Sequence, residues 1–189
     1  MNILTRKILS LLFAIGLYLN AYSQRQDLIG LNVNGEIYQS KFNPSIGVTF
    51  EKQFSKHNGF ESGIFYRTLK SSEQIYFVAT PSFYIYSLTV SERYLTVPVL
   101  YKYYSRILNF SAGPTANLYV GWKQKDNGSP VHIDAYDIDP KFKVGFLTKL
   151  SKVIPLNKQL VIEPELRFGS VETWNEVGLG IGIAGKYRF

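Results

Sequence analysis

The chain has few side chains whose type and spacing would support catalysis. Its 189 residues include two histidines and no cysteine, so thiol nucleophiles, cysteine-bound metals and disulfides are excluded. His132 has Ser129 and Asp134 close by in the sequence, which are the residue types of a catalytic triad. Nucleophile and base must be held within hydrogen-bond distance, and nothing in this polar stretch would hold them there. We therefore expect His132 to be a solvated loop residue, His57 to lie in a tight turn, and the protein to have no catalytic activity.

The segment HIDAYDID also clusters three carboxylates, at Asp134, Asp137 and Asp139. Carboxylates at short spacing can bind Ca²⁺, but the ordered spacing of an EF-hand loop and its glycine are absent. We predict no metal site and no cofactor, and cation binding by this loop stays an open alternative.

Charged residues that alternate with apolar ones form a third group. In QLVIEPELRFG the charges are Glu163, Glu165 and Arg167, and in VGLGIGIAGKYRF they are Lys186 and Arg188. A period of two places the charges on one face of a strand and the apolar residues on the other. If these two segments are neighbouring strands, we expect an ion-pair network of these five residues, with the glycines of the second segment leaving room for it.

The same two-residue period continues along the chain and predicts eight strands. They cover roughly residues 28–37 and 45–54, a third from residue 60, a fourth ending over 94–104, and then 107–122, 141–153, 159–169 and 177–189. The strand-like residues 69–93 predict that strands three and four continue as a hairpin closed near Pro81; the alternative is a ten-stranded protein. Pro98, Pro114 and Pro164 lie in mid-strand, where we expect β-bulges to accommodate them.

The two faces decide which solvent surrounds the strands. The apolar faces end in aromatic residues such as Tyr103, Trp122, Tyr187 and Phe189, as the interface girdle of a membrane barrel would. The connections after strands two, four and six are short and those after strands three and five are long, also typical of outer-membrane barrels. The pattern favours an all-β protein, an eight-stranded antiparallel up-and-down transmembrane β-barrel with a filled lumen and no wide pore. A secreted, soluble, lipocalin-like ligand binder with its apolar face inward is the alternative.

The N-terminal residues predict export from the cytoplasm. Arg6 and Lys7 precede the apolar run 8–19, and small residues at 21 and 23 precede a cleavage point before Gln24. We expect residues 1–23 to be a cleaved signal peptide and residues 24–189 to be one barrel domain in the bacterial outer membrane; an uncleaved anchor helix is the alternative. The net charge of +7 comes with no basic run or nucleic-acid-binding motif, so we expect no nucleic-acid partner.

Two short motifs resemble a known family. YLTVPVLYKYY followed by FSAGPTANLY is similar to the paired signature of the Bacteroidota-type outer-membrane β-barrel domain, a family of OmpA/OmpX-like small barrels that includes the PorT-like proteins. The matching residues are Tyr94, Leu95, Val97, Pro98, Ala112, Gly113 and Pro114. The terminal GKYRF resembles the signal read by the barrel-assembly machinery, which would make Tyr187 and Phe189 its aromatic residues.

The resemblance implies a fold but no assigned activity. It is compatible with a structural, adhesion or secretion-accessory role, in which the partners would be outer-membrane lipid, the assembly machinery during insertion, and a protein bound at the outer loops. Some small barrels modify lipid A with histidine and serine, so an enzyme acting through His132 is the alternative. The oligomeric state is left open.

Overall fold

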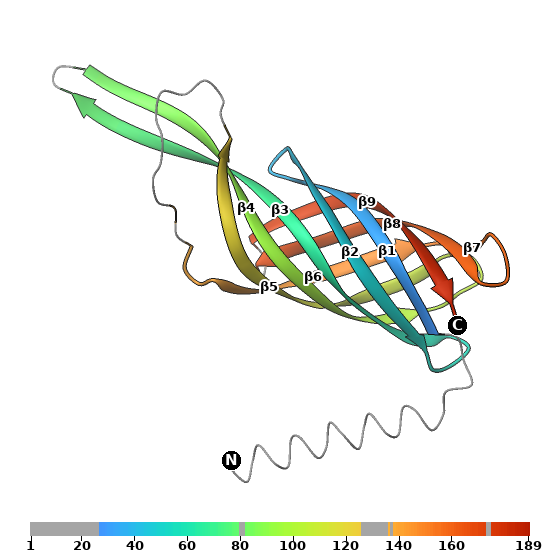
Figure 1. The fold of residues 1–189 in the computed structure, drawn as a ribbon. Helices are drawn as coiled ribbons and strands as arrows, with labels where there is room; N and C mark the ends of the chain where they lie inside the picture. Colours follow the sequence, from blue (N-terminus) through green and yellow to red (C-terminus); the bar gives the residue numbers. More distant parts are fainter. Residues whose placement is uncertain (1–26, 80–81, 126–135, 137, 173–174) are drawn as a thin grey trace, which may run out of the picture.

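Eight long antiparallel strands form a closed barrel in the computed structural model, which describes residues 27–79, 82–125, 136, 138–172 and 175–189 (Figure 1). The long strands are β1 (Asp27–Tyr38), β2 (Lys41–Gln53), β3 (Asn58–Ala79), β4 (Ser82–Tyr103), β5 (Asn109–Lys125), β6 (Phe142–Ser151), β8 (Leu160–Glu172) and β9 (Asn175–Arg188). The two-residue β7 (Ile154–Pro155) pairs only with β8. Within these residues no helix is long and apolar enough to cross a membrane.

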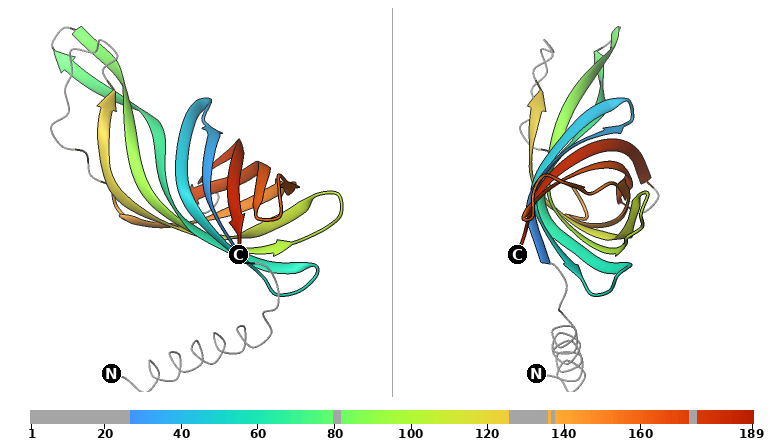
Figure 2. Two further views of the ribbon diagram at one scale, coloured as in Figure 1. Left: turned by 45° about the vertical axis from the view of Figure 1, so that its right-hand side comes forward. Right: turned by 90° about the vertical axis from the view of Figure 1, so that its right-hand side faces the viewer.

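Each long strand pairs with its neighbours in the sequence, and two further ladders close the cylinder. β1 pairs with β9, and β6 pairs with β8 across the short β7 connection. Seen end-on, the strands enclose a continuous ring (Figure 2). The predicted eight-stranded, antiparallel, up-and-down barrel is confirmed, and the ten-stranded alternative is wrong.

β3 and β4 continue well beyond the rest of the wall. Their ladder runs to the pair Ala79↔Ser82, whereas β2 pairs with β3 only as far as Arg67 and β5 pairs with β4 as far as Thr89. The result is a hairpin that projects from one end of the barrel (Figures 1 and 2). This confirms the predicted hairpin, whose ladder is described as far as the pair Ala79↔Ser82.

The β5–β6 connection at the hairpin end, between Lys125 and Phe142, is long as predicted, whereas the two remaining connections at this end are short. β1 and β2 are joined by Gln39 and Ser40 alone, both with positive φ (47° and 61°), and two residues separate β8 from β9. Positive φ at both central residues is the geometry of a type I′ turn, for which sequences usually provide Asn-Gly. The turn was missed because neither residue is a glycine.

The mid-strand prolines do not cause bulges. The register is the same on both sides of Pro98, Pro114 and Pro164, and the ladders simply omit some pairs beside each proline. The register shift lies instead between Arg93 and Tyr94, opposite Gly121, whose φ of +148° suits a glycine. A missing N–H can therefore be accommodated by a local gap in hydrogen bonding, without an inserted residue.

The wall has an apolar outer face and a polar inner face. On β9 the outward Leu179 and Ile181 are 65% and 67% exposed, whereas the inward Lys186 is 1% exposed. Near the hairpin end the interior also holds a small apolar cluster of Tyr38, Leu69, Tyr94 and Val171, with Tyr119 packed against it. The lipocalin-like alternative required the apolar face inward, and it is wrong.

Candidate functional site

The lumen contains a cluster of buried ion pairs contributed by strands from all around the barrel. Lys102 on β4 places its Nζ 2.8 Å from Glu51 on β2 and 2.5 Å from Glu163 on β8. Lys186 on β9 approaches the same two carboxylates at 2.5 Å each. Glu61 on β3 completes the group, 3.5 Å from Lys102 and 3.6 Å from Lys186. These side chains are at most 1% exposed, so water does not screen their interactions.

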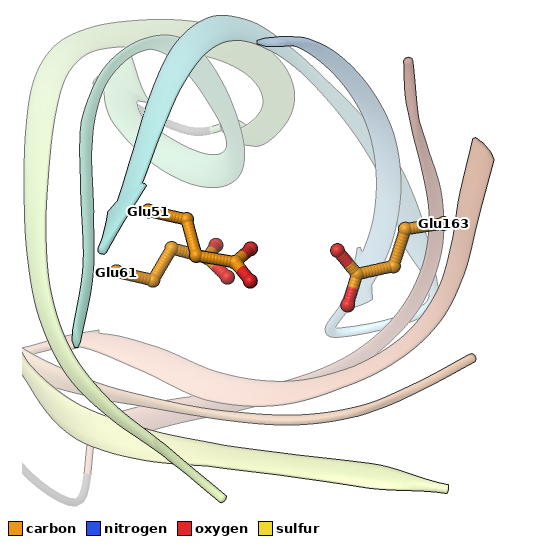
Figure 3. A group of neighbouring side chains, drawn as sticks. All are labelled: Glu51, Glu61 and Glu163. Atoms are coloured by element: carbon orange, nitrogen blue, oxygen red, sulfur yellow. The ribbon is translucent and has the colours of Figure 1, made fainter. Parts of the chain in front are cut away.

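Glu51, Glu61 and Glu163 point toward one another across the interior (Figure 3). One oxygen of each lies within 4.8 Å of the others, which is close enough for a shared cation. Lys102 and Lys186 approach all three carboxylates, however, and supply the compensating positive charge. A divalent ion would be repelled by both ammonium groups, so the geometry favours a set of ion pairs over a metal centre.

The cluster extends toward both ends of the lumen. Lys149 on β6 bridges Glu61 and Glu165, and the hydroxyl of Ser151 donates to Glu163 at 2.5 Å. At the end opposite the hairpin, the hydroxyl of Tyr104 donates to Glu51 at 2.6 Å. Burial, and then the charge of that carboxylate, raise the pKa of Tyr104 well above its usual value, so the hydroxyl stays a donor.

An arginine pair continues the cluster toward the hairpin end. Arg167 lies 2.7 Å from Glu36 and 2.5 Å from Glu165, and Arg67 pairs with the other oxygen of Glu36. Tyr38 accepts a hydrogen bond from Arg67 and donates to Glu36 at 3.2 Å. The connected groups then comprise five carboxylates and five cations: Glu36, Glu51, Glu61, Glu163, Glu165, Lys102, Lys149, Lys186, Arg67 and Arg167.

This equality of charge explains how so many ionised groups are tolerated inside the barrel. A buried charge is expensive unless it is paired and its remaining hydrogen-bonding capacity is used. Each of the five cations contacts at least one carboxylate here, and each carboxylate contacts at least one cation. The side chains that meet this requirement also fill the cross-section, as expected of an eight-stranded barrel.

Three glycines of β9 provide the space for these side chains. A Cβ at Gly182 would lie 2.1 Å from the side-chain oxygen of Asn34, and one at Gly180 would lie 2.5 Å from Cγ of Glu36. At Gly178 a Cβ would meet the ring of Tyr38 at 2.4 Å. The alternating glycines of the last strand thus leave room for the residues of β1 opposite.

Four of the five residues expected to form the ion-pair network lie in this cluster: Glu163, Glu165, Arg167 and Lys186. Arg188 does not. It is half-buried, forms none of these ion pairs, and its Nε is buried without a hydrogen-bond partner. β9 reaches the end of the barrel at this residue, and β8, which carries the acidic residues, begins at Leu160 beside Tyr187.

Sequence reasoning did not assign Glu36, Lys149 or the residues of β2, β3 and β4 to the network. The sequence feature that could have identified these residues is their position on the polar face of a strand. The tilt of the strands, which brings Lys102 to the height of Glu163, is not readable from a period of two.

The family-like motif residues lie on both faces of β4 and β5. Tyr94 is fully buried and donates to Glu92 at 2.7 Å, Pro98 is also buried, and Leu95 and Val97 face outward. Ala112 is half-buried and Pro114 is exposed. A Cβ at Gly113 would lie 2.0 Å from the carbonyl oxygen of Val99, so close strand approach requires glycine there.

The remaining sequence candidates lie at the ends of the barrel. Tyr187 and Phe189 are exposed at the end opposite the hairpin, 41% and 66% respectively. His57 lies in the β2–β3 connection, where its Nδ1 is 3.0 Å from the carbonyl of Tyr104 and its ring stacks on Tyr103. Asp139 is exposed. Ser129, His132, Asp134, Asp137 and the predicted signal peptide lie outside the described residues.

The chain is similar in fold to solved outer-membrane barrels. It resembles the outer membrane protein OprG of Pseudomonas aeruginosa with 11% identity and a TM-score of 0.52, over 87% of this chain and 95% of that one. Neisserial surface protein A (10% identity, TM-score 0.45, 86% and 94% covered) and Ail of Yersinia pestis (11%, 0.43, 87% and 97%) are more distant in shape. No protein-family model and no curated protein sequence matches the chain. The likeness to OprG supports the barrel fold and, at this identity, nothing finer.

Proposed function

We propose that this protein is a non-catalytic barrel of the bacterial outer membrane that holds a β-hairpin outside the membrane for a protein partner, in adhesion or in secretion. The observation that carries the proposal is the inversion of its faces. Charges that a soluble protein would expose lie inside, and apolar side chains that it would bury cover the outside. Such a surface is stable only when hydrocarbon surrounds it, and a closed barrel is the one sheet that satisfies its backbone there.

The hairpin supports the second half of the proposal. Above Arg67 the ladder of β3 and β4 continues to Ala79↔Ser82 beyond the last pairs with β2. Residues 75–91 contain no charged residue, and they include Tyr76, Phe77, Phe83, Tyr84 and Tyr86. A long, uncharged strand edge is suited to accept a strand from another protein, which would bind through main-chain hydrogen bonds.

The filled lumen bears on the alternative role of a pore. Ion pairs join β2, β3, β4, β6, β8 and β9 across the interior. A solute crossing the barrel would have to break several of these contacts. We therefore infer that the barrel anchors and presents the hairpin and does not conduct solutes.

Membrane fractionation tests the proposal directly. We expect the protein in the outer-membrane fraction, with electrophoretic mobility in detergent that changes on heating, and no stepwise conductance in planar bilayers. Recovery as a soluble monomer without detergent would contradict the membrane location, and large conductance steps would contradict the sealed lumen.

A further inference from the structure

The outer face of the barrel has an apolar groove across β2, β3, β4 and β5. Its volume is about 660 Å³, and its lining includes Phe50, Lys52, Phe60, Tyr101, Ala112 and Pro114. The groove lies toward the end of the barrel opposite the hairpin, where β4 ends and β5 begins.

The groove exists because small residues are surrounded by large ones. Ala112 pairs with Tyr101 across the β4–β5 ladder, so a methyl group stands beside an aromatic ring on the outer face. Phe50 and Phe60, on β2 and β3, provide further aromatic side chains, and Pro114 provides a rigid one. Two of the family-like motif residues, Ala112 and Pro114, thus help to shape the groove.

The charge around the groove is positive. Lys52 is the one charged side chain among the residues that line it. The same end of the barrel also carries Lys56, Arg106, Lys152 and Lys158 in its connections, all exposed. In the described part of the chain the sole acidic side chain outside the lumen at this end is Asp27, which lies opposite Lys52 in the β1–β2 ladder and offsets one of these five positive charges. Exposed apolar residues lie next to these cations, including Ile107 (77%) and Leu156 (60%).

A surface that combines apolar side chains with cations fits the boundary between acyl chains and anionic headgroups. We propose that this groove binds one anionic glycerophospholipid, with an acyl chain against Ala112 and the phosphate at Lys52. The inference rests on the proposed membrane location and names the lipid that the barrel selects within that membrane. Acyl chains contact the whole outer face, so selectivity comes from the groove's shape and from the lysine at its edge.

Native mass spectrometry of the purified full barrel tests the proposal. The protein is reconstituted into vesicles of phosphatidylcholine and phosphatidylglycerol in equal amounts and then extracted in a mild detergent. We expect the wild-type barrel to retain one phosphatidylglycerol. Ala112→Phe should lose that lipid because the ring fills the groove, whereas Ala116→Phe, a matched change on the outer face of the same strand, should retain it.

Lysine variants separate charge from shape. Lys52→Gln should retain a lipid but lose the preference for phosphatidylglycerol over phosphatidylcholine, while Lys158→Gln, an exposed lysine at the same end, should keep it. Heat-dependent mobility confirms that each variant is folded, and Ala112→Leu replaces Ala112→Phe if the latter is not.

Four results would overturn the inference, and a fifth would contradict the proposed function on which it rests. The groove binds no selected lipid if folded Ala112→Phe retains phosphatidylglycerol like the wild type, or if Lys52→Gln keeps the preference. It is a protein interface if Ala112→Phe abolishes an oligomer of the wild type and leaves its lipid content unchanged. A barrel that does not enter vesicles in any form contradicts the proposed function itself, whereas entry without lipid selection contradicts only this inference.

Discussion

At the scale of single residues, the lumen illustrates how buried charge is made tolerable. Lys102 contacts three carboxylates, and its side chain is 0% exposed. The ion pairs need not stabilise the barrel relative to an apolar interior. Removing one partner is different, because the carboxylates left behind stay buried without compensation.

We predict that Lys102→Met lowers the free energy of unfolding by about 3–5 kcal/mol, the usual effect of breaking a buried ion pair. Urea titration of the protein in detergent or vesicles, followed by tryptophan fluorescence, measures the change. Lys158→Met, at an exposed lysine, should change the free energy by no more than about 0.5 kcal/mol. Equal effects of the two substitutions would show that the cluster is hydrated.

The glycines of β9 allow a second test with a control on the same strand. Gly182→Val should destabilise the barrel by about 1–3 kcal/mol, because the new side chain overlaps Asn34 and Glu165 in a full lumen. Gly185→Ala should be nearly neutral, since a Cβ there meets no atom within 4 Å. The same urea titration compares the two, and a neutral Gly182→Val would mean that the lumen has free space.

The direction of each side chain was predictable from the sequence, but its partners were not. Alternation placed Glu163 and Lys186 on one face, and that face is the interior. Alternation does not give the register and tilt of one strand relative to the next. The contacts of Lys102 with Glu163 and of Arg167 with Glu36 therefore could not be derived. Arg188 was assigned to the network for the same reason. Periodicity places its side chain on the polar face, but it does not indicate whether an acidic residue of the neighbouring strand lies at the same level.

At the scale of elements, the strands were largely predictable and the connections less so. A face that alternates over ten residues identifies a strand, and the hairpin of β3 and β4 follows from the strand-like segments on both sides of Pro81. The tight turn at Gln39 and Ser40 lacks the usual glycine, and tertiary pairing of β1 with β2 imposes its conformation.

The hairpin should be separable from the barrel. We predict that replacing residues 74–87 by Asn-Gly, which joins Glu73 to its partner Leu88, leaves a folded barrel, because the β2–β3 ladder lies entirely below this point and the β4–β5 ladder begins at Thr89. The shortened protein should keep its heat-dependent mobility and lose adhesion or secretion activity. Loss of the folded form would instead make the hairpin part of the barrel's own stability.

At the scale of the whole molecule, the environment of the outer face is the decisive property. Ile181 is 67% exposed, and in a water-soluble barrel its replacement by a charged residue would be harmless. In a membrane the same position faces hydrocarbon. The two environments therefore predict opposite outcomes for one substitution.

We predict that Ile181→Arg destabilises the barrel by about 2–4 kcal/mol in vesicles, the range for arginine on the lipid face near mid-bilayer. Leu156→Arg, in a connection at the barrel end, is similarly exposed and should cost about 1 kcal/mol or less. Urea unfolding from vesicles measures both. Equal and negligible effects would place the outer face in water.

The ladder between β6 and β8 is the shortest among the long strands. It comprises the pairs from Phe146↔Ser170 to Ser151↔Glu165, after which the neighbouring strand is interrupted until β7 pairs at Ile154 and Pro155. Local opening is easiest where the fewest hydrogen bonds must break together. The amide protons of β6 that face β8 should therefore exchange with solvent deuterium earlier than those of the β3–β4 ladder within the barrel, which makes this seam the point at which the wall first opens.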